Sequence, residues 1–152
     1  MNRSKIRGGS ILLLIAAVLW ISPGLGCKKA PDPVKTLDTW FKAAAVCDKP
    51  RMRKVFTPKL LAVMDRIFRR GSAFFGSGLK IDVILAMCKA YKHTKWHVVS
   101  KKINGDTATI SAVVNRQNIR FRLRLKSGTW QIYSMSSPVY QVDEGGLHSA
   151  GR

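Results

Sequence analysis

Hydrophobic residues recur at helical spacing through residues 33–91 and at strand spacing after Thr94. In the first region they return every three or four positions, which gathers them on one face of a helix. The pattern predicts helices over 33–46 and 80–91, with a short helical turn and a third helix between them. Thr57-Pro58 places a capping residue before a proline, as at many helix starts. The first half of the folded region is therefore predicted to be helical.

After Thr94 apolar and polar residues alternate, which is the period of a strand with one buried face. Three turn signals divide this region: Asn104-Gly105-Asp106, Arg116-Gln117-Asn118 and Ser127-Gly128. They predict four antiparallel strands with one apolar face, which the helices would cover. Helices followed by such a sheet form an α+β domain of two layers.

Two boundaries follow from composition. Arg69-Arg70-Gly71 is expected to end the third helix, because glycine often follows the last helical residue. Residues 138–152 are rich in glycine and polar side chains, so this tail is predicted to be disordered. A single domain over 33–137 remains.

The charge of the chain is strongly positive. Its 152 residues include 27 Lys and Arg against 8 Asp and Glu, and such a field attracts anionic partners. On the third predicted strand, Arg120, Arg122, Arg124 and Lys126 project from one side, about 7 Å apart. This row is a candidate contact for anionic lipid or lipopolysaccharide, or else a solvated face that discourages pairing between sheet edges. No aromatic residue interrupts it, so nucleic acid is not an expected partner.

The N-terminus has the form of an export signal. Eleven consecutive apolar residues, Ile11 to Ile21, follow a basic start and precede Pro23 and Gly24. We expect residues 1–26 to be this signal, with 27–32 as a tether that holds the domain within about 20 Å of the membrane. Two alternatives stay open: cleavage without lipid attachment, and an uncleaved anchor.

Leu25-Gly26-Cys27 is similar to the lipobox of bacterial lipoproteins. The resemblance implies that Cys27 is acylated and becomes the new N-terminus, bound to the membrane of the cell envelope. The mature chain then keeps 24 Lys and Arg against 8 Asp and Glu, a net charge of +16. The well-known sorting rule retains a lipoprotein at the inner membrane when an aspartate directly follows the acylated cysteine. Here Lys28 follows Cys27, so the periplasmic side of the outer membrane is expected where that rule applies.

The other two cysteines, Cys47 and Cys88, are expected to form a disulfide in this oxidising compartment. The alternative is a pair of buried free thiols. His93, His97 and His148 show no ligand spacing with either cysteine, so no metal site is expected.

Several short motifs resemble a known fold family. They are Trp40-Phe41-Lys42-Ala43-Ala44, Phe56-Thr57-Pro58-Lys59-Leu60, Gly105 to Ile110 and Leu125 to Ile132. Together they are similar to small bacterial lipoproteins of the nuclear-transport-factor-2-like superfamily, which includes lumazine-binding-like domains. The resemblance implies a cone-shaped domain in which a curved four-stranded sheet wraps against helices, often with a pocket at its open end. It implies no activity, because this fold carries enzymes, receptors and interaction modules alike.

A pocket of that kind has several candidate residues. They are Asp38, Trp40, Phe41, Trp96, His97 and Tyr133. Aromatics at these spacings are also typical of an ordinary core. An isomerase or dehydratase would need Asp38 or His97 as its general base, but each also fits a plain surface position.

The sequence contains no catalytic triad order, phosphate-binding loop or paired carboxylates, and no cofactor is expected. We therefore expect a lipid-anchored module that binds a ligand or an envelope protein complex without chemistry of its own. The pocket enzyme is the alternative.

Overall fold

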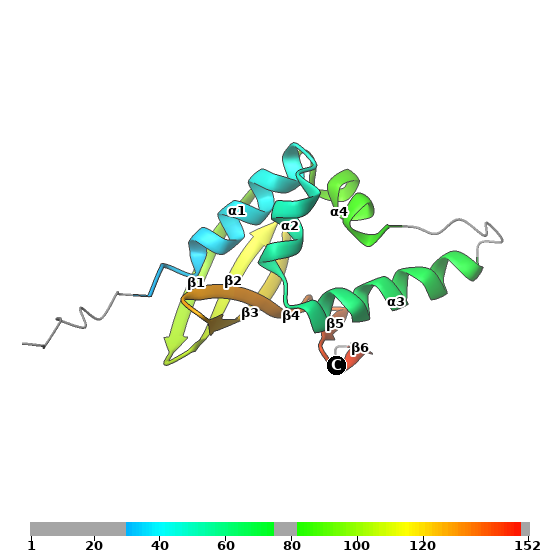
Figure 1. Ribbon diagram of the computed structural model, residues 1–152. Coiled ribbons are helices and arrows are strands. Elements are labelled where there is room, and N and C mark those ends of the chain that lie inside the picture. The colour runs from blue at the N-terminus through cyan, green and yellow to red at the C-terminus, as the bar shows by residue number, and fades with distance from the viewer. Residues whose placement is uncertain (1–29, 75–81, 150–152) are drawn as a thin grey trace, which may run out of the picture.

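The computed structural model describes residues 30–74 and 82–149, with the backbone alone for 71–74. In this part of the chain, four helices cover one face of a six-stranded antiparallel sheet (Figure 1). The helices are α1 (Val34–Ala45), α2 (Lys49–Val55), α3 (Pro58–Phe74) and α4 (Val83–Tyr91). The strands are β1 (Trp96–Asn104), β2 (Thr107–Val114), β3 (Gln117–Lys126), β4 (Thr129–Ser136), β5 (Tyr140–Asp143) and β6 (Gly146–Ser149). The α+β prediction is confirmed.

The strands follow one another in space in chain order, each antiparallel to the next. On β2 and β3 every second side chain is buried against the helices, as the alternation predicted. The β3–β4 turn is at Ser127-Gly128, where both residues have positive φ, as a two-residue hairpin requires. The β2–β3 turn is at Asn115-Arg116, also with positive φ, one residue before the predicted signal.

The predicted number of strands and the predicted disordered tail are wrong. Residues 140–149 form the hairpin β5–β6, which extends the sheet from four strands to six. Val142 is buried and pairs with Met135 of β4. In the turn, the Asp143 carboxylate accepts hydrogen bonds from the N–H groups of Gly145 (2.8 Å) and Gly146 (3.2 Å). Pairing with β4 and one carboxylate therefore order a segment that has little apolar pattern of its own.

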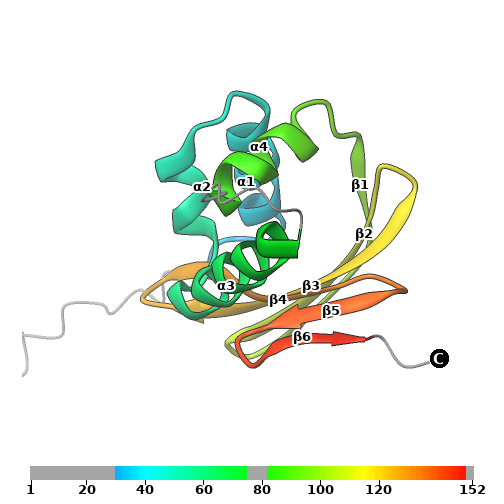
Figure 2. The same ribbon diagram turned by 90° about the vertical axis from the view of Figure 1, so that its right-hand side faces the viewer.

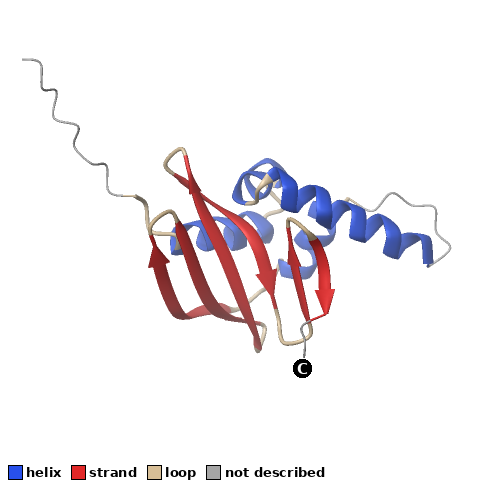
Figure 3. Cartoon of the chain, turned by 90° about the horizontal axis from the view of Figure 1, so that it is seen from below, coloured by secondary structure: helices blue, strands red, loops and turns tan. Residues whose placement is uncertain are grey.

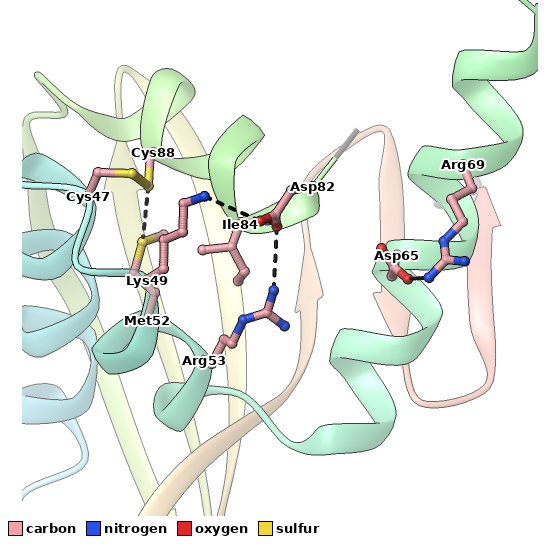
Figure 4. A network of polar contacts seen from close by, with 9 residues as sticks. All are labelled: Cys47, Lys49, Met52, Arg53, Asp65, Arg69, Asp82, Ile84 and Cys88. Carbon is pink, nitrogen blue, oxygen red and sulfur yellow. Dashed lines mark hydrogen bonds and ion pairs between the residues drawn. A yellow bond between two sulfur atoms is a disulfide. The ribbon is translucent and has the colours of Figure 1, made fainter. Parts of the chain in front are cut away.

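The third helix is also longer than predicted. It continues through Arg69-Arg70-Gly71 to Phe74, so that signal does not end it. An ion pair between Asp65 and Arg69, one turn apart, supports the helix just before this point (Figure 4). The glycine costs about 1 kcal/mol relative to alanine within a helix, which is too little to stop one that packs elsewhere along its length.

A disulfide and an ion-pair cluster hold the first, second and fourth helices together (Figure 4). Cys47, just after α1, is bonded to Cys88 of α4, with their Cα atoms 5.1 Å apart, which confirms the predicted disulfide. Asp82 caps α4 by accepting a hydrogen bond from the Ile84 N–H, and its carboxylate lies 3.4 Å from Lys49 and 3.5 Å from Arg53 of α2. Partial burial works against ionisation, but the bonds from Ile84 and Lys49 outweigh it and lower the Asp82 pKa.

Residues 1–29, which contain the predicted signal and Cys27, lie outside the described residues. None of the described helices is both long enough and apolar enough to cross a membrane.

Candidate functional site

An apolar groove lies where α3 and α4 meet the last strands of the sheet, with a volume of about 420 Å³. Figure 2 shows both helices above β5 and β6 at this end of the curved sheet. The lining is contributed by α3 (Met64, Ile67, Phe68), α4 (Ala86, Met87, Ala90, Tyr91) and the sheet (Met135, Tyr140, Val142, Leu147). The site therefore joins elements that are far apart in the sequence.

Helical spacing explains how the α3 side of the groove forms. Met64, Ile67 and Phe68 are three and four positions apart on α3, so they lie on one face. At the rim, Phe68 is 38% exposed and Leu147 is 55% exposed, which leaves large apolar surface open to water. Contiguous exposed apolar surface marks binding sites in soluble domains.

The described lining of the groove is almost entirely apolar. No charged side chain is among its described lining residues. Three methionines contribute flexible, polarisable surface that adapts to ligands of different shape. Tyr91 and Tyr140 are the described lining residues with a polar side-chain group, each with one hydroxyl.

Tyr91 is held firmly by the core. Its ring lies 5.0 Å from that of Trp40 and 6.1 Å from that of Phe41. Burial, with a smaller contribution from Tyr140, raises the pKa of Tyr91 to about 12. At neutral pH this residue is therefore a neutral hydroxyl, suited to hydrogen bonding with a ligand and unsuited to removing a proton.

This pKa predicts a loss of stability in alkali. The raised folded-state value means that the stabilisation is present below pH 10, where the unfolded tyrosine keeps its proton, and is lost as pH rises toward 12. The full loss is about 3 kcal/mol in the free energy of unfolding. Denaturant titrations of the wild type and of Tyr91→Phe at pH 9 to 12 measure it. A wild-type curve that falls no faster than the variant's would contradict the assignment.

The predicted pocket residues do not surround one cavity. Trp40 and Phe41 are buried in the core, and Trp96 stacks on Phe41 with ring centres 4.7 Å apart. Tyr133 is on the outer face of the sheet. The guanidinium carbon of Arg124 lies over its ring, 4.7 Å from the ring centre.

The two candidate general bases are on the surface. The Asp38 carboxylate lies 2.7 Å from the Lys42 ammonium on the solvent side of α1. His97 is exposed on β1. Neither residue lines the groove.

The predicted row of cations is on the outer face of the sheet, which Figure 3 shows in front of the helices. Arg120, Arg122, Arg124 and Lys126 are all exposed and alternate with buried or half-buried residues of β3. Arg124 lies 3.8 Å from Glu144, while Arg120 and Arg122 form no ion pair with any described carboxylate. The geometry of the row is as expected, and its contact with an anionic surface stays a prediction.

No group of three or more potential metal ligands occurs among the residues whose structure is described. The two described cysteines are joined to each other.

The sequence pattern does not predict the groove. Its α3 residues show the spacing of a core face, and nothing in that pattern tells a covered face from an open one. Its floor is β5 and β6, which were predicted to be disordered. The signal in the sequence is the alternation of Tyr140 and Val142 with the polar Gln141 and Asp143, which is short but typical of a strand.

Comparison with known proteins returns no match: the chain is similar to no protein-family model, no curated protein and no solved structure.

Proposed function

We propose that this protein is a lipid-anchored binding module of the bacterial cell envelope, which holds a small apolar ligand such as an acyl chain. The observation that carries the proposal is the groove between α3, α4 and the β5–β6 hairpin. Its volume of about 420 Å³ falls in the range of small-molecule sites, and its described lining is apolar apart from two tyrosine hydroxyls. Because Asp38 and His97 lie outside it, the proposal is binding without chemistry.

The envelope location is supported by the chain's chemistry. The apolar run before Leu25-Gly26-Cys27 fits an export signal followed by lipid attachment. The Cys47–Cys88 disulfide suits an oxidising compartment such as the periplasm. With Lys28 after the acylated cysteine, we place the protein on the periplasmic side of the outer membrane. Mass spectrometry of the mature N-terminus tests the anchor, and an unmodified Cys27 would remove it.

The finer fold class is part of the same proposal. A curved antiparallel sheet with helices on one face and a groove at one end is the arrangement expected of a nuclear-transport-factor-2-like domain (Figure 2). The two extra strands, β5 and β6, widen the sheet at the groove end.

Titration with a fluorescent fatty acid tests the proposed ligand class. We expect the wild type to bind the probe with increased fluorescence. Ala86→Trp, which fills the groove from α4, should reduce affinity at least about tenfold, because a large ring replaces the volume that the ligand needs.

Ala62→Trp is the matched control. Ala62 is exposed on α3 and does not line the groove, so this variant should bind like the wild type. Absence of binding to the wild type, or equal losses in both variants, would contradict the proposed ligand class.

A further inference from the structure

A second hollow, of about 350 Å³, lies at the root of the tether. It is formed by the first half of α1, one face of α2 and the β3–β4 turn. The chain enters the domain at this end, while the α3 and β5–β6 elements of the groove lie at the other (Figure 1). The hollow and the groove are thus separate sites at opposite ends of the domain.

Three cations line the hollow: Lys35 from α1, and Arg51 and Lys54 from α2. Arg51 and Lys54 are three residues apart, which places them on one face of their helix. Neither side chain forms an ion pair with a carboxylate among the described residues. The charge of this face is therefore not neutralised within the described domain.

One carboxylate, that of Asp32, also lines the hollow, and it is already engaged. Its oxygens accept hydrogen bonds from the Lys101 ammonium at 3.1 and 3.2 Å and from the Val34 N–H at 3.0 Å. The bond from Val34 and the charges of Lys101 and Lys35 lower the Asp32 pKa. With Asp32 turned to these partners, the hollow keeps a positive excess.

The end of the tether is fixed to the rim of this hollow. The Trp130 indole N–H donates a 2.6 Å hydrogen bond to the carbonyl of Pro31. Four peptide steps separate Pro31 from Cys27, which is about 14 Å when fully extended. If Cys27 carries a lipid, the hollow must lie close to the membrane surface.

We propose that this hollow binds the phosphate of an anionic membrane lipid, as a second contact beside the lipid anchor. The inference rests on the anchoring in the proposed function. A guanidinium and two ammonium groups around a space of about 350 Å³ suit a phosphodiester head group, since arginine binds phosphate through two parallel hydrogen bonds. Basic residues next to a membrane anchor strengthen attachment to anionic leaflets.

The proposed contact also sets the orientation of the domain. With the tether end against the lipid surface, α3 and the β5–β6 hairpin, which line the groove, lie at the end of the domain farther from the membrane (Figure 1). The groove would then be accessible to a ligand or partner arriving from the periplasm.

Vesicle binding by the mature chain carrying Cys27→Ser tests the hollow without the lipid. Among the described residues, the buried side chains lie between Pro33 and Val142, so removal of residues 1–26 takes none of them. We expect binding to phosphatidylcholine vesicles that contain phosphatidylglycerol and little binding to phosphatidylcholine alone. Arg51→Gln with Lys54→Gln should weaken the binding roughly tenfold or more.

The matched control is Arg66→Gln with Lys89→Gln. These two cations are exposed on α3 and α4 and do not line the hollow, so the control removes the same charge elsewhere. It should change binding by less than about threefold, because screening limits the effect of distant charges. Equal losses in the two double variants, or no preference for anionic vesicles, would overturn the proposal.

A competition arm identifies the source of the phosphate. Inorganic phosphate and a control salt are compared at equal ionic strength. If both displace the wild type from vesicles to the same extent, the lipid assignment stands. Tight binding of inorganic phosphate to the hollow, with the two double variants equal on vesicles, would assign it to a soluble phosphate ester instead. Mass spectrometry of Cys27 tests the anchor separately, so a failed hollow and a failed anchor give different results.

Discussion

Replacing Trp40 with alanine is expected to lower the free energy of unfolding by about 3–5 kcal/mol, much of the stability of an ordinary domain. Trp40 is fully buried. Its ring lies 5.4 Å from Phe56, 5.7 Å from Phe121 and 5.0 Å from Tyr91. The residue therefore joins α1 to the end of α2, to β3 and to α4, and its removal leaves a cavity between the two layers.

Trp40→Phe should cost much less than Trp40→Ala. The Trp40 indole N–H is buried without a hydrogen-bond partner among the described residues. Such a donor carries a penalty of about 1–3 kcal/mol, and phenylalanine removes the donor while keeping most of the ring. Guanidinium titrations followed by circular dichroism measure all three proteins, with Val139→Ala, 74% exposed in the wild type, as the control. Equal costs for Trp40→Phe and Trp40→Ala would refute the account of the unpaired donor.

The central sheet is predictable from the sequence because one face of each central strand is buried. Burial alternates along all of β2 and along β3 from Ile119 onward, because successive side chains of a strand point to opposite faces of the sheet. Turn chemistry is a weaker guide. The β2–β3 turn uses Arg116 at a φ of 69°, which its side chain does not favour, so the register of the hairpin decides the turn.

The last two strands are not predictable in the same way. Val142 is their one fully buried apolar residue, while Leu147 is largely exposed. Their order depends on pairing with β4 and on packing against α3, and both arise only when the rest of the domain is folded. Strand preference of this kind depends on neighbours more than on local sequence.

The groove is not predictable from the sequence either, because β5 and β6 form part of it. Of the aromatic residues expected around a pocket, Trp40 and Phe41 are in the core and Trp96 packs against it, as their spacing equally allowed, while Tyr133 lies on the outer face of the sheet. The groove is formed where α3, α4 and the β5–β6 hairpin come together, and no local pattern records that arrangement. The hollow at the tether is similar, since its cations come from two helices that only the fold brings together.

Removal of the Cys47–Cys88 disulfide is the second large effect that we expect. The bond closes a loop with a sequence separation of 41, for which loop-closure entropy gives roughly 4 kcal/mol. It also fixes the end of α1 to α4, where the Cys88 sulfur packs 3.6 Å from that of Met52 in the buried layer. The variant with Cys47→Ala and Cys88→Ala should lose about this much stability in guanidinium titration. Reductant should destabilise the wild type and leave the variant unchanged.

The backbone at Cys47 allows a sharper form of this test. Cys47 follows α1 at a φ of 54°. Its N–H donates to the Ala44 carbonyl (3.2 Å), and the Asp48 N–H donates to the Ala43 carbonyl (2.8 Å). These bonds form the helix-ending motif that favours glycine at the position of Cys47. A side chain there is strained, so the variant with Cys47→Gly and Cys88→Ala should be about 1 kcal/mol more stable than the one with two alanines. If the order of these two variants is reversed, the left-handed conformation at Cys47 is imposed by the disulfide and not by the helix end.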